Sequence, residues 1–148
     1  MSHLDALGWS PFFSNFVPPE SDLRPARVVE QQRALYRLRA EAGEFNASPT
    51  GRLRHSVSQP ADLPVVGDWV LVDCAANIHS VLPRRRSFSR KAAGAKTAEQ
   101  VLAANVDIAF VVTSLNADLN LRRLERYMTL IWNSGAQPVI LLSKADLC

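Results

Sequence analysis

The sequence has 148 residues, of which 47% are hydrophobic, enough apolar material for one ordinary domain or two very small ones. The formal net charge of +3 is modest, so the charge of the whole chain does not by itself indicate a nucleic-acid-binding protein. No apolar run approaches the roughly 20 residues of a membrane-spanning helix, and residues 1–11 do not have the pattern of a secretory signal. We therefore expect a soluble, cytoplasmic protein with no membrane partner.

The chain begins with an aromatic, proline-rich segment and continues as a series of short strands. Residues 1–23 carry Trp9 and three phenylalanines among three prolines, so we expect an extension that packs onto the next domain without regular structure. Strand-like runs bounded by turn residues follow at 27–29, 35–39, 44–47, 65–72 and 78–82. Five short strands within residues 24–83 predict a small closed barrel of the OB type, although an SH3-like barrel fits nearly as well. Trp69 and Tyr36 lie in apolar strands and are expected in its core.

The next segment, residues 84–104, is strongly basic at its start. Arginines beside the ring of Phe88 suit RNA phosphates and bases, whereas a solvated hinge is an equally weighted alternative. Residues 97–100 read Thr-Ala-Glu-Gln, the spacing of a helix-capping box, so we expect a basic linker that ends in a short helix. Basic residues of the barrel, Arg52, Arg54 and His55, could extend the same patch. The candidate RNA contacts are Arg52, Arg54, Arg84, Arg85, Arg86, Arg90, Lys91 and Lys96.

Residues 105–148 have the pattern of an α/β protein. The runs 107–113 and 138–142 are continuous apolar stretches of strand length, typical of strands buried in a parallel sheet. Helical spacing recurs between them at Leu121, Leu124, Met128 and Ile131. Asn120 is placed to cap this helix and Gly135 to end it, so the segment predicts one right-handed βαβ unit. A single unit leaves apolar strands uncovered, and we expect it to self-associate, to pack on the barrel or to be partly disordered.

The string Ser143-Lys144-Ala145-Asp146 directly follows the second apolar strand. Open α/β sheets bind ligands at the carboxyl ends of their strands. A carboxylate at Asp146 can accept two hydrogen bonds from guanine, which offers a donor pair that adenine lacks, while the stem of Lys144 covers the base. An ordinary solvated strand end is the plainer alternative for so short a string.

Two other short patterns carry no assigned chemistry. Residues 94–97 look like the end of a phosphate-binding P-loop, but Ala95 stands where glycine is required and no buried strand precedes the loop. Without a P-loop, this chain alone is not expected to hydrolyse a nucleotide. Cys74 and Cys148 have no Cys or His companions at ligand spacing, so neither a disulfide scaffold nor a metal site is expected.

A series of short motifs runs through most of the chain in a fixed order. It comprises Leu7-Gly8-Trp9, Pro25-Ala26-Arg27-Val28, Gly51-Arg52-Leu53-Arg54, Val66-Gly67-Asp68-Trp69-Val70, residues 88–94 and 99–107, and Asn120-Leu121-Arg122-Arg123-Leu124. This series resembles the ribosome small-subunit-dependent GTPases of the RsgA (YjeQ) family. The resemblance implies an OB barrel, a circularly permuted GTPase domain in which the guanine-recognition motif precedes the P-loop, and a zinc-binding C-terminal domain.

The resemblance also implies functional roles for the nucleotide-binding candidates Ser143, Lys144, Ala145 and Asp146. Asp146 is expected to read the guanine edge and Lys144 to lie along the base. The family usually has Asn or Thr at the position of Ser143, a departure expected to affect affinity more than specificity. The P-loop, the switch regions and the zinc ligands would follow Cys148, so residues 105–148 are expected to form only the start of a P-loop GTPase-like α/β domain.

The function implied by the resemblance is GTP hydrolysis in late maturation of the small ribosomal subunit. Its partners are that subunit and its ribosomal RNA, and its cofactors are GTP or GDP, Mg²⁺ and structural Zn²⁺, none of them expected on this chain alone. The alternative is a free-standing OB-fold module that binds RNA and hydrolyses no nucleotide.

Overall fold

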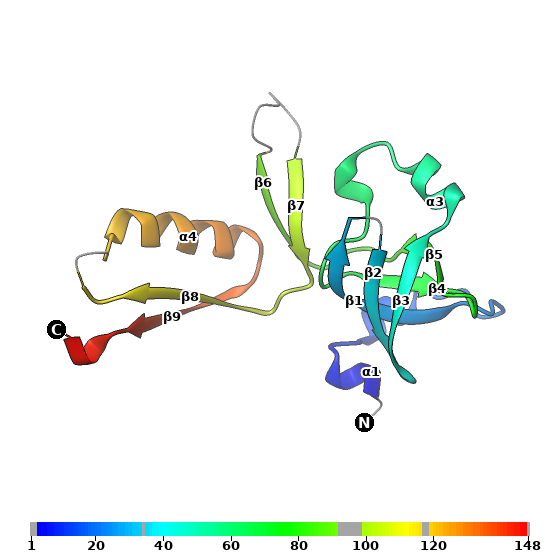
Figure 1. Ribbon diagram of the computed structural model, residues 1–148, viewed down its shortest axis with the longest axis horizontal. Helices are drawn as coiled ribbons and strands as arrows, with labels where there is room; N and C mark the ends of the chain where they lie inside the picture. The colour runs from blue at the N-terminus through cyan, green and yellow to red at the C-terminus, as the bar shows by residue number, and fades with distance from the viewer. Residues whose placement is uncertain (1–2, 34, 92–98, 117–118, 148) are drawn as a thin grey trace.

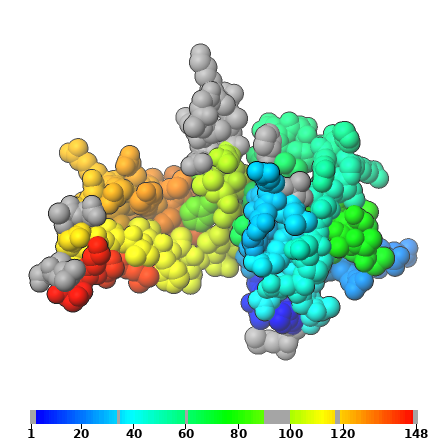
Figure 2. Space-filling model, viewed as in Figure 1, coloured from blue at the N-terminus to red at the C-terminus, as the bar shows by residue number. Residues whose placement is uncertain are grey.

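The fold consists of a barrel and a βαβ unit that lie side by side and are joined through a β-hairpin (Figures 1 and 2). The structure is a computed structural model, and it describes residues 3–33, 35–91, 99–116 and 119–147. No helix among these residues is long and apolar enough to cross a membrane.

Five strands form the barrel: β1 (Arg24–Gln32), β2 (Leu35–Ala40), β3 (Gly43–Pro49), β4 (Trp69–Val72) and β5 (Asn77–Val81). Their order is β1-β2-β3-β5-β4, with β4 closing antiparallel onto β1 and β3 pairing with β5 in parallel. The helix α3 (Gly51–Ser56) and the 3-10 turn η1 (Pro60–Asp62) connect β3 to β4. Thr50 caps α3, since its hydroxyl accepts the N–H of Leu53 at 3.1 Å. This arrangement confirms the predicted OB-type barrel.

Alternation along the strands explains the core of the barrel. Tyr36 and Leu38 on β2 point inward with Ala26 and Val28 on β1, whereas the intervening residues are more exposed. β4 is buried along its whole length because its two faces are both covered. One face lies in the barrel core, and Trp69 and Leu71 on the other face pack against the N-terminal segment. The expectation that Trp69 and Tyr36 are core residues is confirmed.

The N-terminal segment, residues 3–23, packs onto the barrel as expected but contains two short helices, α1 (His3–Ala6) and α2 (Pro11–Ser14). The prediction that it lacks regular structure was wrong. Pro11 lies in the first turn of α2, where proline has no hydrogen bond to lose. Trp9 meets Trp69 edge-on, with 4.7 Å between ring centroids, and the Glu41 carboxylate accepts the N–H groups of His3 and Leu4.

The basic segment forms an antiparallel hairpin of β6 (Ser87–Lys91) and β7 (Glu99–Ala104), which projects from the junction of the two bodies (Figure 1). The predicted short helix at the end of this segment was therefore wrong. A capping box is worth only about 1 kcal/mol, while pairing with β6 and a bond from the Ala104 N–H to the Val66 carbonyl oxygen (2.9 Å) satisfy the β7 backbone. Thr97 and the glycine-containing stretch 94–97 lie outside the described residues.

The βαβ unit has the predicted composition: β8 (Ile108–Ser114), α4 (Leu121–Asn133) and β9 (Gln137–Ser143), followed by the 3-10 turn η2 (Ala145–Leu147). The strands are parallel, in register from Ile108 opposite Gln137 to Ser114 opposite Ser143. Asn120 caps α4 by accepting the N–H of Arg123 at 3.0 Å, and Gly135 follows the helix with φ +80°. Phe110 and Val112 are 63% and 65% exposed, so these apolar strands are not buried on both faces within this chain.

Candidate nucleotide and RNA interfaces

The candidate guanine-recognition segment forms the carboxyl end of β9. The Ser143 hydroxyl donates to the Thr113 carbonyl oxygen (3.3 Å), and the Ser143 carbonyl oxygen accepts the N–H of Leu115 (3.1 Å). Lys144 has φ +58°, a left-handed conformation that turns the chain sharply out of the strand. Ala145 and Asp146 then enter η2, and all four residues are exposed. The segment therefore presents its polar side chains to solvent at the sheet edge where the sequence predicted a ligand site.

A hollow of about 290 Å³ lies beside this sheet edge, between β8 and the start of α4. Its polar lining includes Ser114, Asn120 and Arg123. Ser114 donates to the side-chain oxygen of Asn116 at 2.8 Å and stands opposite Ser143 in the sheet. The hollow thus lies next to the candidate segment, although its lining comes from β8, α4 and the residue before that helix.

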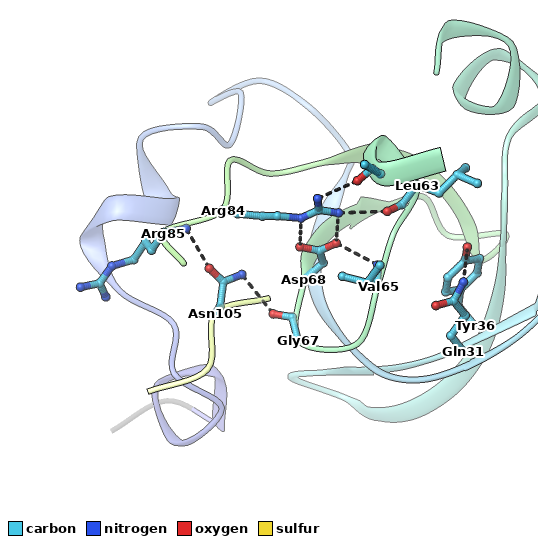
Figure 3. Close-up of polar contacts among 10 residues, drawn as sticks. Gln31, Tyr36, Leu63, Val65, Gly67, Asp68, Arg84, Arg85 and Asn105 are labelled. Atoms are coloured by element: carbon cyan, nitrogen blue, oxygen red, sulfur yellow. Dashed lines mark hydrogen bonds and ion pairs between the residues drawn. The ribbon is translucent and has the colours of Figure 1, made fainter. Parts of the chain in front are cut away.

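Arg84, a candidate RNA contact, is instead bound to a fully buried carboxylate (Figure 3). Its Nε and Nη2 donate to the two oxygens of Asp68, each at 2.8 Å, and Asp68 is 0% exposed. The remaining donors reach the carbonyl oxygens of Ala61 (2.7 Å) and Leu63 (3.0 Å). The N–H of Val65 also donates to Asp68, at 2.9 Å. Arg84 therefore connects η1 to the turn before β4, and its charge is neutralised by Asp68.

Arg86 is likewise used within the protein, on the side of the βαβ unit. It forms an ion pair with Asp107, which immediately precedes β8. Its side chain also lies over Gly135, where an added Cβ would come within 3.5 Å of the Arg86 stem. The Arg86 carbonyl oxygen accepts the N–H of Asn105 at 2.9 Å. Arg86 thus helps to fix the start of β8 and the end of α4.

Arg85, between these two anchored arginines, is exposed. Its backbone N–H donates to the Asn105 side-chain oxygen at 2.9 Å, and its guanidinium lies 6.0 Å from the ring centroid of Phe12. Among the residues that the structure describes, this guanidinium has no carboxylate partner. Of the three consecutive arginines, Arg85 is the one that offers its charge to solvent.

The other candidate RNA contacts lie in a separate region. Arg52 and Arg54 are exposed on α3, and His55 beside them is exposed as well. The turn η1, which follows α3, contacts β7, whereas α3 itself contacts β5. The backbone of Arg90 and Lys91 ends β6, while their side chains and the whole of Lys96 lie outside the described residues.

Sequence reasoning missed the junction between the barrel and the βαβ unit. Arg27 on β1 donates to the carbonyl oxygens of Leu7 and Asn105, and it lies over the Trp69 ring. Asn105, buried with φ +52°, donates to the Gly67 carbonyl oxygen at 3.1 Å. Burial lowers the pKa of the Arg27 guanidinium, and the charge of Asp107 acts in the opposite direction. An arginine between inward-facing residues of a barrel strand and a lone Asn before an apolar strand were the available signals.

Comparison with known proteins agrees with this arrangement. A protein-family model described as RsgA GTPase matches residues 81–148. Proteins named small ribosomal subunit biogenesis GTPase RsgA are 44% identical over 97% of the chain in Opitutus terrae and 42% identical over 99% in Syntrophotalea carbinolica. A relative named RsgA 2, from Vibrio parahaemolyticus, is 44% identical over 98% of the chain. The chain spans 43%, 43% and 39% of the length of these three curated relatives.

Two solved structures share the fold. The structure of YjeQ from Thermotoga maritima matches with a TM-score of 0.63 at 19% identity, over 85% of this chain and 43% of that one. The structure of YloQ, described as a circularly permuted GTPase, matches with a TM-score of 0.59 at 17% identity, over 89% of this chain and 45% of that one. Sequence and fold together show that the chain belongs to the RsgA family and corresponds to its N-terminal region.

Proposed function

We propose that this chain is part of a ribosome-associated GTPase that acts in late maturation of the small ribosomal subunit. The observation that carries the proposal is 42–44% identity, over nearly the whole chain, to proteins named small ribosomal subunit biogenesis GTPase. The partners are then the small subunit and its ribosomal RNA, and the protein acts in the cytoplasm.

In this proposal the end of β9 recognises guanine. Asp146 accepts hydrogen bonds from the base edge, and the stem of Lys144 lies along the base. The exposure of both residues at the carboxyl end of a parallel strand, just after a left-handed turn, supports these roles. The Ser143 hydroxyl donates a hydrogen bond to the backbone of β8 and so helps to hold the segment in place.

Hydrolysis requires a phosphate-binding loop, which the sequence lacks, so we expect the chain alone to bind guanine nucleotide weakly and to hydrolyse none. Within the described residues, no three His, Cys, Asp or Glu side chains are grouped to hold a metal ion. We assign the Mg²⁺ and Zn²⁺ of such a GTPase to regions outside these residues. The exposed apolar strands β8 and β9 would then be covered by further parts of a GTPase domain or by a second copy of this chain.

The barrel and its neighbouring basic residues would bind ribosomal RNA. The contacts that remain available are Arg52, Arg54, Arg85, Arg90, Lys91 and Lys96, and the first three are exposed in the structure. Exposed arginines near an OB-type barrel can neutralise RNA phosphates, and the affinity that they supply falls as the salt concentration rises.

The test is co-sedimentation of the chain with purified small ribosomal subunits over a range of salt concentrations. Replacing Arg52, Arg54 and Arg85 by alanine should weaken binding and reduce the slope of log K against log salt by about 1 for each lost phosphate contact. Arg122→Ala, an exposed arginine on α4, is the matched control and should change neither quantity. Unchanged affinity and slope in the triple variant would overturn the RNA-contact assignment.

The second candidate function is a free-standing RNA-binding module, which the closed barrel favours because it needs no further strand to complete its sheet. Binding of the chain to the small subunit without any response to added guanine nucleotide, together with no detectable guanine binding at Asp146, would favour this alternative.

A further inference from the structure

The aromatic residues of the N-terminal segment divide into an inward and an outward pair. Trp9 and Phe13 face the barrel, where Phe13 is 1% exposed and lies 5.9 Å from the Trp69 ring. Phe12, in α2, and Phe16, in the turn after α2, are 38% and 42% exposed. Their ring centroids are 5.3 Å apart, with 64° between the ring planes. Two adjacent aromatic rings therefore remain accessible on the surface.

The outward pair, Phe12 and Phe16, is held in place by the inward pair, Trp9 and Phe13. The rings of Phe12 and Phe13 pack in a T-shaped arrangement, with 5.1 Å between their centroids. The N–H of Phe16 donates to the Phe13 carbonyl oxygen at 3.0 Å. Because Phe13 is fixed between Trp9 and Trp69, the backbone that carries Phe12 and Phe16 is fixed as well. A ligand that stacks on these rings would lose little conformational entropy from the protein side.

A cation lies beside the outward pair. The guanidinium of Arg85 is 6.0 Å from the Phe12 ring, and the Arg85 backbone is held by the buried Asn105 side chain. Arg84 is bound to the buried Asp68 and Arg86 is paired with the exposed Asp107, so Arg85 is the arginine of the three that lies against the Phe12 ring. The folded chain thus sets one exposed arginine next to two partly exposed aromatic rings.

We propose that Phe12, Phe16 and Arg85 form a binding platform for single-stranded RNA, on which the two rings stack nucleobases and Arg85 binds a phosphate. This inference rests on the proposed RNA-binding function and assigns it a further site. Stacking on aromatic rings requires unpaired bases, whereas the bases of an A-form duplex are not accessible to such rings. A positive charge without a carboxylate partner among the described residues favours a polyanionic ligand over an apolar protein surface.

The charge pattern makes the platform distinct from the surface around α3. Residues 1–23 contain Asp5, Glu20 and Asp22 but no Lys or Arg, so the positive charge at this place comes from Arg85. We therefore expect base stacking to supply most of the affinity there. Removing the rings should lower affinity without changing its salt dependence, whereas removing Arg85 should reduce the salt slope by about 0.7, the value for one phosphate of a single strand.

The experiment measures binding of the whole chain to a fluorescent single-stranded RNA and to an RNA duplex of the same length, by anisotropy at several salt concentrations. The double variant F12A/F16A should bind the single strand about fivefold or more weakly, with an unchanged salt slope. The variant F12W/F16W should retain binding, because it keeps the aromatic faces. Trp132→Ala, which removes a more exposed ring from α4, is the control and should bind normally.

Three results would overturn the platform. Single-stranded RNA binding could be unchanged in F12A/F16A, it could fall as much in the Trp132 variant, or F12A/F16A could weaken binding to small subunits while leaving RNA binding intact. The last result would show that the rings contact a protein. If the unmodified chain binds small subunits with the expected salt dependence in any of these cases, only the platform fails. If the chain shows no salt-dependent binding to small subunits, the proposed function fails instead.

Discussion

Arg27 and Asn105 are 78 positions apart in the chain, yet a guanidinium nitrogen of Arg27 donates to the backbone carbonyl oxygen of Asn105 at 2.9 Å. The Asn105 side chain in turn donates to the Gly67 carbonyl oxygen and accepts the N–H of Arg85. One buried asparagine therefore connects β1, the turn before β4 and the basic segment. Through these bonds the barrel and the first residues of the βαβ unit are fixed to each other.

Arg84→Ala should be strongly destabilising, because it leaves the buried Asp68 carboxylate without its counter-charge. Losing one partner of a buried ion pair costs about 3–5 kcal/mol of unfolding free energy. Arg85→Ala is the matched control for stability and should change the free energy by no more than about 0.5 kcal/mol. Urea denaturation of the unmodified chain and of both variants, monitored by tryptophan fluorescence, measures both values. Equal stability of the two variants would show that Arg84 is not an anchor of the barrel.

Gly67→Ala should disrupt the contact between the barrel and the hairpin. Gly67 has φ +91°, and an added Cβ would lie only 2.0 Å from the Ala104 carbonyl oxygen. Gly43→Ala is the control for backbone strain alone, since Gly43 has φ +118° but open space around its Cβ position, and it should cost about 1–2 kcal/mol. Thermal unfolding should show a larger loss for Gly67→Ala, with faster amide exchange at Ala104 and Asn105. Similar losses in the two variants would mean that the steric clash is relieved at no cost.

Asp73 should make the stability of the barrel depend on pH in the acid range. Its Oδ2 lies 2.8 Å from the Nε2 of His79, and its Oδ1 accepts the N–H groups of Ala75 and Asn77. Hydrogen bonds to the Asp73 carboxylate hold its pKa well below the ordinary value of 3.8, and the bond from His79 has the largest effect, followed by those from Asn77. Because the folded pKa lies below the unfolded one, this stabilisation is present above about pH 3.8 and is lost as the pH falls further.

Melting temperatures of the unmodified chain and of Asp73→Asn, taken from about pH 5 down to about pH 2, test this expectation. The unmodified chain should be the more stable at pH 5, and the difference should shrink toward acid pH. A difference that stays constant over this range would mean that Asp73 does not contribute through its charge.

Asp146→Asn should reverse the base preference of the proposed nucleotide site. Guanine presents an amino group where xanthine presents a carbonyl oxygen, so a carboxylate suits the former and an amide donor suits the latter. Chemical-shift titration of the chain with GDP and XDP suits weak binding and gives the ratio of the two affinities. Lys144→Ala should weaken both nucleotides and leave the ratio unchanged. A ratio that does not respond to Asp146→Asn would place guanine recognition elsewhere.

Phe110→Asp should reduce any self-association of the chain. Phe110 and Val112 lie on β8 and are 63% and 65% exposed, which makes this strand face a candidate contact between copies. Sedimentation equilibrium should show a concentration-dependent dimer for the unmodified chain and a monomer for the variant. Leu35→Asp, at an exposed leucine of the barrel, is the control and should leave the dimer intact. A monomer at all concentrations for the unmodified chain would contradict self-association.

The sequence allowed the barrel and the βαβ unit to be predicted because each depends on local periodicity. Alternation marked β2, continuous apolar runs marked β8 and β9, and Asn120 marked the start of α4. The strand β7 was not predictable in this way. Its capping-box signal concerns a few local bonds, whereas its conformation depends on β6 and on the carbonyl oxygen of Val66, which is distant in sequence.

The candidate site residues likewise differ in how far the sequence could predict their positions. The position of Ser143 to Asp146 followed from the strand before it, so the sequence sufficed to place it at the end of β9. The roles of Arg84 and Arg86 did not follow, because their partners Asp68 and Asp107 become neighbours only in the folded chain. A run of basic residues in a sequence reports total charge, while the charge available to RNA depends on which carboxylates the fold brings close.

The partner that each arginine of the triplet meets, more than the number of arginines, therefore determines what this segment can do. Arg84 and Arg86 are paired with Asp68 and Asp107, whereas Arg85, at a bend in the chain between them, is exposed. Inserting one alanine before Arg84 would leave the composition and the net charge nearly unchanged. It would nevertheless place alanine opposite the buried Asp68 carboxylate, while an arginine would still occupy the exposed position beside Phe12. Relatives of this chain that differ here by a one-residue insertion are thus expected to differ in stability.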